Sequence, residues 1–428
     1  MSDPQAFSTT RRQIAGIQAG DLAAQFGTPT YIYDAATIIQ RFAELHQFDT
    51  VRFAQKACSN LAVVDLVRRQ GGLVDTVSAG EIRRALAAGY GGGSPDGTAG
   101  DSPPEIVYTA DIFDHEALDL VVEHDLHVNA GSADMIGQLG EARPGSDLTL
   151  RINPGFGHGH SQKTNTGGEH SKHGIWHEEL EEALQSAARH QVTISGLHMH
   201  IGSGTDLEHL AQVCEVMDRV ARQVGDTVHS ISAGGGLPIP YQEGESCIDL
   251  ARHFELWDSV RNGLQDDFGH RVNLEIEPGR FLVAESGFLL TEIRAVKRMG
   301  KNLFYLVDAG FNNLARPILY GAYHPISVVP SDDEPRQEVE VIVGGPLCES
   351  GDIFTQQEGG FVRSRRLPEA RVGEYLVLEC AGAYGAVMGS NYNSKPHAAE
   401  VLVTDGQAEL VRRRQSSEDL FRDERIPG

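Results

Sequence analysis

Residues that could do chemistry follow four apolar runs of the chain. Lys56 ends the first run, His200 ends the second, the glycines Gly234–Gly236 follow the third, and Glu277 ends the fourth. A lysine at the end of a buried strand is poorly solvated, and desolvation favours the neutral amine that forms Schiff bases. Three successive glycines bring bare backbone N–H groups close to a phosphate. These residue types together indicate a site that binds a phosphorylated aldehyde.

Each feature also has a structural explanation. Lys56 could extend from a strand end into solvent, and three glycines often form only a tight turn. His200 alone is more often a packing histidine, and Glu277 before Pro278 could be a solvated turn residue. Their joint position at the ends of successive strands is what favours a functional site.

The elements that must position these residues are short apolar strands separated by helical patterns. Eight strands are predicted, at 51–56, 73–77, 105–109, 126–129, 148–152, 194–200, 229–233 and 272–276. Such alternation over about 250 residues indicates an α/β fold, a (β/α)8 barrel, in which active sites lie at the carboxyl ends of the strands. A doubly wound open sheet is the alternative, and strand counting does not exclude it.

Helix-start signals fit this pattern. Asn60 can cap a helix that begins near Leu61, and Ser78 to Glu81 has the spacing of a capping box. Asp34 can cap a helix over about 36–48. Long loops are predicted at 91–104, at the inactive end of the barrel, and at 153–176, at its active end.

The pattern changes near residue 285. Strands are predicted at 30–33, 288–296, 303–307, 339–343, 375–378 and 400–404, with little helix between them. We therefore predict a barrel domain over residues 35–285. A C-terminal β-rich barrel or sandwich domain is predicted from 286–428 together with 1–34, the N-terminal arm contributing a strand.

Composition limits the partners and the compartment. The 428 residues carry a net charge of −24, which argues against nucleic acid or an anionic membrane as partner. Five scattered cysteines and no apolar leader indicate a reducing, cytoplasmic environment without a disulfide framework. Two His-x-His pairs, at 158–160 and 198–200, are weak metal signals because no nearby carboxylate completes a ligand set, so we predict no metal. The arginine clusters at 363–366 and 412–414 are predicted as solvated or interface charge.

The chemistry that unites the four strand ends is that of pyridoxal phosphate. Lys56 would bind the aldehyde, and Glu277 would pair with the pyridine nitrogen and keep it protonated. His200 would lie against the ring face. The triple glycine, with Ser203 and the amide of Gly279, would hold the phosphate.

The same residues carry a family resemblance from about Thr28 to Gln415. The chain resembles the fold-type III pyridoxal-phosphate decarboxylases (alanine racemase-like barrels), and within them the diaminopimelate decarboxylases of the proteobacterial form, which complete bacterial lysine synthesis. The matching motifs are Phe53–Cys58, Val74–Glu81, His200–Ser203, Gly234–Gly236, Glu277–Arg280, Gly345–Asp352, Gly382–Ala386 and the histidine-rich segment Gly155–Asn165.

The resemblance implies roles for further residues. Lys56 would hold the cofactor as an internal aldimine, and the site would form at a homodimer interface, with Cys348 and Glu349 supplied by the partner subunit. Arg280, Arg316, Tyr320 and Tyr384 would contact substrate. Arg280 and Tyr384 would also lie near the cofactor.

The implied substrate, meso-diaminopimelate, is an amino acid at both ends. Arg280 and Arg316 can grip its distal carboxylate bidentately, and Glu349 can take the distal ammonium. Loss of CO2 leaves a carbanion that must be protonated, and Cys348 is the candidate acid. Cysteines are usually buried small hydrophobes, which is the alternative for Cys348.

Two other functions stay open. A sibling decarboxylase of ornithine, arginine or carboxynorspermidine would leave Arg316 without a distal carboxylate. A non-catalytic pyridoxal-phosphate carrier would need no proton donor, so Cys348 argues against it.

Overall fold

The computed structural model describes residues 7–92, 103–156, 167–200, 202 and 207–428. The chain forms two compact units. The first, here called the barrel unit, contains residues Ile39–Pro238 and Ile248–Phe281. The second, here called the β unit, contains Met1–Ile38, Ile239–Cys247 and Leu282–Gly428. Segment 239–247 thus belongs to the β unit, although it lies within the stretch that the sequence analysis assigned to the barrel.

The barrel unit is a closed ring of eight parallel strands. The ring closes because β8 pairs with β10 as well as with β7, in the order β10-β11-β12-β4-β5-β6-β7-β8. The barrel prediction is confirmed, and a closed ring rules out the open doubly wound sheet. The strands are β4 (Thr50–Ala54), β5 (Leu73–Thr76), β6 (Ile106–Ala110), β7 (His127–Ala130), β8 (Asp147–Asn153), β10 (Thr193–His198), β11 (Ser230–Ser232) and β12 (Asn273–Ile276). A two-residue strand, β9 (Ile175–Trp176), also pairs with β8.

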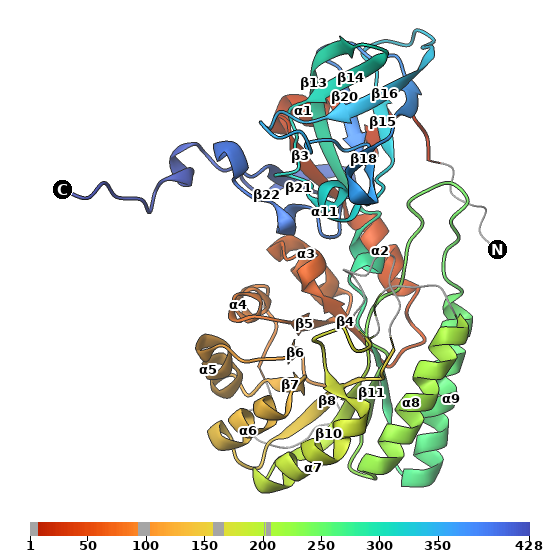
Figure 1. The fold of residues 1–428 in the computed structure, drawn as a ribbon, viewed down its shortest axis with the longest axis vertical. Coiled ribbons are helices and arrows are strands. Elements are labelled where there is room, and N and C mark those ends of the chain that lie inside the picture. The colour runs from red at the N-terminus through yellow and green to blue at the C-terminus, as the bar shows by residue number, and fades with distance from the viewer. Residues whose placement is uncertain (1–6, 93–102, 157–166, 201, 203–206) are drawn as a thin grey trace. The chain divides into compact units, whose positions relative to one another are not determined.

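Helices follow most of these strands and lie outside the ring (Figure 1). They are α3 (Leu61–Arg69), α4 (Ala79–Ala87), α5 (His115–Glu123), α6 (Ala133–Ala142), α7 (Leu180–Arg189), α8 (Leu207–Val224) and α9 (Leu250–Phe268). The helix α2 (Ala35–Ala43) precedes β4 and ends five residues before the predicted boundary. Residues 44–48 turn more tightly there, with Leu45 and Phe48 donating to carbonyls three residues back.

Two predicted helix caps are confirmed. The Asn60 side chain accepts a hydrogen bond from the Ala62 amide at 3.0 Å. Ser78 Oγ accepts from the Glu81 amide at 3.2 Å. The reciprocal bond of the Ser78 box runs from the Val77 amide to Glu81 Oε2 at 2.9 Å, one residue before the cap. Both caps fix the start of the helix that follows a strand of the candidate site.

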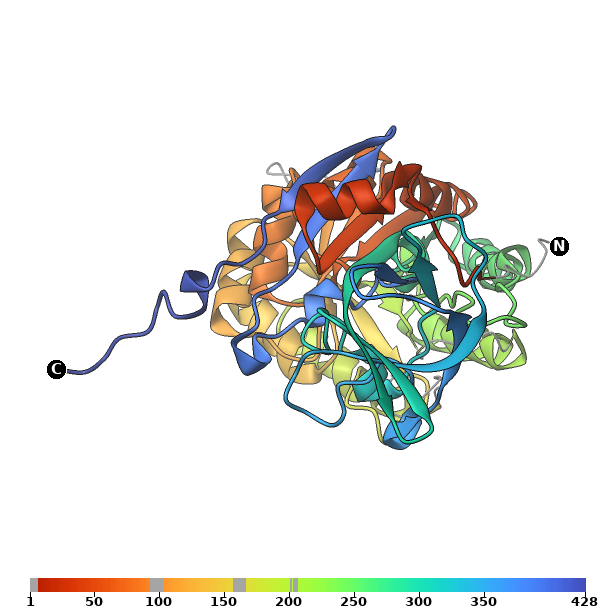
Figure 2. The same cartoon turned by 90° about the horizontal axis from the view of Figure 1, so that it is seen from above.

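The β unit is built around one sheet in the order β19-β16-β14-β13-β3-β21-β22. Strand β20 (Tyr375–Leu378) pairs with both β13 and β15 (Ile326–Val329). Figure 2 shows two segments from opposite parts of the chain, coloured red and blue, side by side where β3 pairs with β21. The path consists of β3 (Thr30–Asp34), β13 (Gly287–Met299), β14 (Asn302–Val307), β16 (Glu338–Gly344), β19 (Arg365–Pro368), β21 (Ala399–Thr404) and β22 (Gln407–Arg412).

The remaining elements of the β unit are short. Helix α1 (Ala19–Phe26) packs with β3, β13 and β21 in one apolar cluster that includes Leu22, Ile32, Leu290 and Val401. Helix α11 (Arg316–Tyr320) carries two predicted substrate residues. The small hairpins are β1 (Gln13–Ile14) with β2 (Ile17–Gln18), and β17 (Gln356–Gln357) with β18 (Phe361–Val362). Among the described residues, no helix combines the length and the apolar character that crossing a bilayer requires.

Two arginines predicted as solvated or interface charge bind backbone carbonyls of their own chain. Arg414 donates to the Pro29 carbonyl at 2.7 Å and to Thr30 Oγ1 at 3.0 Å, next to the start of β3. Arg365 donates to the His324 carbonyl, and its guanidinium lies 3.6 Å from the ring centroid of Tyr323. The solvated alternative was wrong for both, because carbonyl groups far away in the chain, which the local sequence does not reveal, accept their hydrogen bonds.

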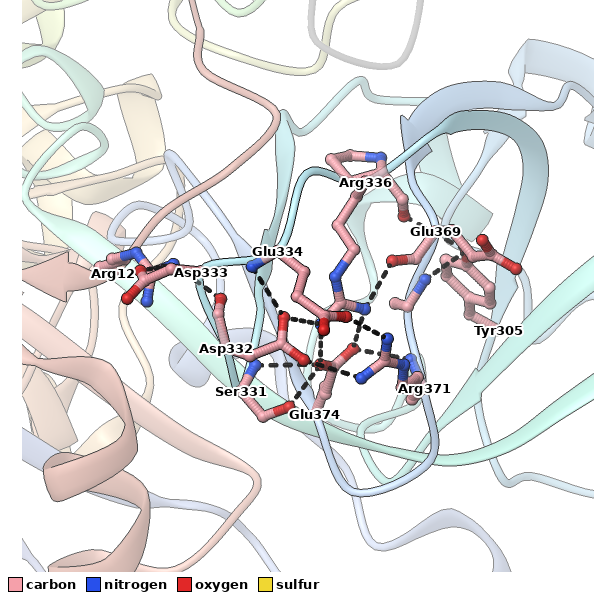
Figure 3. Close-up of polar contacts among 12 residues, drawn as sticks. Arg12, Tyr305, Ser331, Asp332, Asp333, Glu334, Arg336, Glu369, Arg371 and Glu374 are labelled. Atoms are coloured by element: carbon pink, nitrogen blue, oxygen red, sulfur yellow. Dashed lines mark hydrogen bonds and ion pairs between the residues drawn. The ribbon is translucent and has the colours of Figure 1, made fainter.

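A buried carboxylate organises one end of the β unit. Glu374 accepts hydrogen bonds from the amide and hydroxyl of Ser331, from the Arg371 amide and from Arg336, all between 2.7 and 2.9 Å. Figure 3 shows the Asp332 carboxylate beside Arg336 and Arg371, which both donate hydrogen bonds to it. These bonds attach the charged loop at 331–337 to the turn before β20.

Replacing Glu374 by Gln should destabilise the protein, because the amide cannot accept all four bonds and leaves Arg336 undercompensated. We expect a loss of about 2 kcal/mol in the free energy of unfolding. Urea unfolding of the full chain measures it. The matched control is Glu338→Gln, which removes an exposed ion pair with Arg366 and should cost at most about 0.5 kcal/mol. Equal losses in both variants would contradict a special role for Glu374.

Candidate active site

Lys56 lies just beyond the end of β4, in the single turn Gln55–Ala57, rather than on the strand itself. Its Nζ is 3.8 Å from Asp75 Oδ2, and Asp75 lies at the end of the neighbouring strand β5. The Asp75 side chain is buried, and its Oδ1 has no hydrogen-bond partner among the described residues. Lys56 keeps 40% of its side chain exposed, so its amine is reachable while its stem is held.

The environment of Asp75 shifts its proton equilibrium. Burial raises the pKa of Asp75 to about 6, an effect that the charge of Lys56 opposes and the charge of Glu277 reinforces. Asp75 therefore exchanges its proton near neutral pH, beside the amine that is the candidate Schiff-base group.

Glu277 is a buried carboxylate bound from two strands. His198 Nε2, at the end of β10, lies 2.8 Å from Glu277 Oε2, and Ser232 Oγ, at the end of β11, donates to Oε1 at 2.9 Å. Burial alone would raise the pKa of Glu277. The charge and hydrogen bond of His198, with the bond from Ser232, outweigh burial and lower that pKa to about 2. Glu277 is therefore ionised across the physiological range.

The triple glycine lies directly against this acid. A Cβ on Gly235 would lie 2.4 Å from the Glu277 carbonyl oxygen, and one on Gly236 would lie 2.0 Å from the Gly202 carbonyl oxygen. Gly234 and Gly236 also have φ of +63° and +95°, which other residues rarely adopt. The Gly234 amide donates to Ser232 Oγ at 3.1 Å. Glycine is thus required here by both space and conformation.

His200 presents a neutral ring beside the glycine turn. The Gly235 amide donates to His200 Nδ1 at 3.1 Å. Because Nδ1 accepts this hydrogen bond, the proton of the neutral ring is on Nε2. Burial, followed by the positive charges of Arg151 and Lys56, lowers the pKa of His200 well below its usual value. A flat, uncharged imidazole can pack against an aromatic ring without adding charge to it.

Three residues that the sequence analysis left without a role belong to this cluster: Asp75, His198 and Arg151. Arg151, near the end of β8, is only 7% exposed. Burial lowers the pKa of its guanidinium, and the carboxylates of Asp111, Glu277 and Asp75 oppose that shift. All three lie within a residue or two of the carboxyl end of a predicted strand, which is the signal that could have found them.

The other predicted residues of the barrel unit lie close to this cluster in the chain. A Cβ on Gly279 would lie 3.2 Å from the Ala57 Cβ, so this glycine lies beside the Lys56 turn. Arg280 begins the short helix α10 (Arg280–Val283). Ser203, like His158 and His160, falls outside the described residues. His198 pairs with Glu277, and the described residues contain no cluster of three or more potential metal ligands.

The remaining predicted site residues lie in the β unit. Arg316 is 6% exposed and donates to Tyr241 and His324. Tyr320, at the end of the same helix, is half-buried, as is Tyr384, which has a φ of +56°. Two loop residues, Cys348 and Glu349, are exposed. The Cys348 amide donates to Asn393 Oδ1 at 2.7 Å, which anchors that loop.

The class of the barrel is defined by a family match. Residues 35–284 match the family described as "Pyridoxal-dependent decarboxylase, pyridoxal binding domain". The sequence-based prediction of pyridoxal phosphate as cofactor is confirmed by this match.

Proteins of similar sequence identify one family within this class. The chain is 53% identical over 421 residues to the diaminopimelate decarboxylase of Escherichia coli (strain K12), which covers 98% of this chain and 99% of the relative. It is 52% identical over 435 residues to that of Streptomyces coelicolor, covering 100% and 97%. A crystal structure of a diaminopimelate decarboxylase matches with a TM-score of 0.92 at 53% identity, covering 98% and 99%. The chain belongs to the diaminopimelate decarboxylase family.

The described residues fit the cofactor on three observations. A buried carboxylate with a pKa of about 2 suits a cationic pyridinium nitrogen. Glycine backbone that no Cβ could occupy suits a closely bound phosphate. A half-exposed lysine lies just beyond the end of β4, the strand next to β12, and β12 itself ends one residue before the acid.

Removing the His198 contact should shift the pH dependence of activity. Without the bond and charge of His198, burial dominates and the pKa of Glu277 rises from about 2, so kcat/KM of a His198→Leu variant should fall at the acid end of the pH range, where Glu277 does not limit the unmodified protein. His198→Gln, which keeps a donor near Nε2, should lose less there. The measurement is kcat/KM between pH 5 and 9. His127→Leu, at the amino-terminal end of β7, is the control. An unchanged kcat/KM at the acid end in His198→Leu would rule out this role.

Proposed function

We propose that this protein decarboxylates meso-2,6-diaminopimelate to L-lysine and CO2, the last step of lysine biosynthesis. The observation that carries the proposal is 53% identity over nearly the full length to enzymes named for this activity. The buried, ionised Glu277 supports it independently, because a protonated ring nitrogen strengthens electron withdrawal. A crystal structure of the Helicobacter pylori relative, 29% identical, is described as complexed with L-lysine.

The residues that would hold pyridoxal phosphate are those of the barrel cluster. Lys56 would bind it through Nζ, and Glu277 would keep the proton on the ring nitrogen. Neutral His200 would lie against the ring, and the Gly234–Gly236 amides, with Ser203, Gly279 and Arg280, would hold the phosphate end. When bound, the cofactor supplies an aldehyde for the substrate amine and a ring that accepts the electron pair released with CO2.

Substrate recognition is assigned to residues of matching charge. Arg280 and Arg316 would bind the distal carboxylate, and Glu349 would bind the distal ammonium. Tyr320 and Tyr384 would border the same group. The buried Arg316 supports this assignment, since a guanidinium shielded from water attracts a carboxylate strongly.

Cys348 is proposed as the proton donor. As the bond between Cα and the carboxyl group breaks, CO2 leaves, and Cα then takes a proton from Cys348 Sγ. The thiolate regains a proton from solvent. Cys348 is exposed and anchored through its amide, which suits a group that must reach a substrate.

A homodimer that shares its active sites is part of the proposal, with Cys348 and Glu349 acting on the partner's cofactor. The β unit exposes Leu319 (44%), Phe361 (71%) and Val362 (48%) on α11 and β18. Helix α11 contacts β17, which pairs with β18, so these apolar side chains lie on neighbouring elements. An exposed apolar surface of this kind favours association of two copies.

Two parts of the sequence-based description stay proposals. The domain boundaries at residues 34/35 and 285/286 lie close to those of the two compact units. A cytoplasmic location is supported by the five cysteines, all within the described residues, none of which forms a disulfide.

The direct test is CO2 release from meso-diaminopimelate by the purified protein with added pyridoxal phosphate, with ornithine and arginine in parallel. We expect release from diaminopimelate alone, with lysine as product. Release from ornithine or arginine instead would favour a sibling decarboxylase. Absence of release from any of them, with the cofactor absorbance present, would favour a non-catalytic carrier.

Cys348→Ala tests the proton donor. We expect turnover to fall by on the order of 10² or more while cofactor absorbance is retained, because the variant loses an acid but no cofactor contact. Cys247→Ala is the matched control, since Cys247 is also an exposed cysteine of the β unit. Unchanged turnover in Cys348→Ala would assign the proton to another group.

A further inference from the structure

The hydrogen bonds of His324 show which of its two ring nitrogens carries the proton. His324 is 1% exposed, and its Nδ1 lies 3.0 Å from the Glu379 backbone carbonyl oxygen. A carbonyl oxygen only accepts, so Nδ1 carries the proton and donates. Nε2 is then a lone-pair acceptor, and Arg316 donates to it from Nη1 at 2.9 Å.

A second neutral acceptor binds the same nitrogen. Arg316 Nη1 also donates to the Tyr241 hydroxyl at 3.2 Å, and the guanidinium carbon lies 5.0 Å from the Tyr241 ring centroid. The Tyr241 and His324 rings meet edge to face, with centroids 5.6 Å apart. Two aromatic side chains therefore fix both the position and the plane of the guanidinium.

The partners of Arg316 leave its charge uncompensated. Within the part of the chain that the structure describes, Arg316 forms no ion pair, and Nη2 and Nε have no hydrogen-bond partner. A carboxylate partner in place of His324 would neutralise the buried cation. A neutral imidazole holds it in place and leaves the Nη2–Nε edge, a bidentate fork, for an anionic ligand.

The backbone around His324 is fixed as well. Gly321, with φ of +61°, caps the carboxyl end of α11, and the chain turns back to place His324 beside Arg316. A Cβ on Gly321 would lie 1.9 Å from the Glu358 amide nitrogen, so only glycine permits this turn. Arg365 donates to the His324 carbonyl and stacks on Tyr323. Contacts to both its ring and its backbone thus hold His324 in place.

We propose that His324, assisted by Tyr241, is a positioning residue that orients Arg316 for the carboxylate at the non-reacting end of the substrate. This inference rests on the proposed function and extends it to specificity. In this role His324 acts through its contact with Arg316 and takes no part in the chemical step. It makes recognition of a carboxylate, rather than of a second amine alone, a property of three residues of the β unit.

Two amide substitutions at His324 distinguish the contributions of its two ring nitrogens. In His324→Gln the amide oxygen can reach the position of Nε2 and accept from Arg316. In His324→Asn the shorter amide can only replace Nδ1 and donate to the Glu379 carbonyl. Asparagine therefore preserves the anchor and loses the contact with Arg316, whereas glutamine preserves that contact.

The test compares two ligands on the holoenzyme. L-Lysine keeps the distal carboxylate, and 1,5-diaminopentane lacks it; binding is followed by the change in cofactor absorbance. For His324→Asn we expect lysine to bind about tenfold more weakly and the KM for diaminopimelate to rise similarly, with kcat and diaminopentane binding nearly unchanged. His324→Gln should stay within about threefold of the unmodified protein.

Other outcomes would overturn the inference. Unchanged lysine binding in His324→Asn would do so, as would equal losses for both ligands or equal losses in both variants, which indicate a merely structural role. If His324→Asn does not fold, Tyr241→Phe is measured in its place. Lysine binding weakened about threefold would support the inference, and unchanged lysine binding would contradict it.

Arg316→Met distinguishes this inference from the proposed function. If Arg316→Met binds lysine as well as the unmodified protein does, the assignment of Arg316 to the substrate carboxylate fails, and with it part of the proposed function. If Arg316→Met loses lysine binding while His324→Asn and Tyr241→Phe do not, only the positioning role fails.

Discussion

A carboxylate that stays ionised although it is buried is the constraint on which the end of the barrel depends. Glu277 keeps its charge because an imidazole from β10 and a hydroxyl from β11 bind its two oxygens. The same hydroxyl accepts a hydrogen bond from the first amide of the glycine turn. The acid, the turn and His198 therefore form one bonded unit across three neighbouring strands, in which a change to one part changes the others.

In both compact units, the hydrogen-bond partners of a buried ionisable side chain determine whether that side chain keeps its charge. Asp75 and Glu277 are both buried carboxylates, yet burial raises the pKa of Asp75 to about 6, while bonded partners lower that of Glu277 to about 2. One of these acids can exchange protons near neutrality, and the other acts as a fixed charge. Arg316 is a fixed charge of the opposite sign, held by a neutral imidazole and a phenol. Neutral partners position such charges without cancelling them.

The sequence predicted the strands, and it predicted that the candidate site residues at their ends lie together, because both leave local signals. Apolar runs, capping residues and the glycine triplet are readable within a few residues, and the parallel barrel brings the strand ends together. Asp75 and His198 were missed because a polar residue inside a short apolar run does not reveal its partner. Arg365 and Arg414 were wrongly assigned to solvent for a related reason: their acceptors are backbone carbonyls far away in the chain. Contacts of this kind become predictable only once the topology is known.

The position of β3 inside the sheet of the β unit has a consequence for how the protein is made. Strand β3 lies between β13 and β21, and Tyr33 donates to Glu400 Oε2 across 367 positions of sequence. The sheet therefore cannot be completed until residues 399–404 have left the ribosome, whereas the barrel strands lie between residues 50 and 276. During synthesis, β3 presents an unpaired edge for as long as its last neighbour is missing. Completion of this sheet thus requires that synthesis has passed β21, whereas the barrel strands are all made earlier.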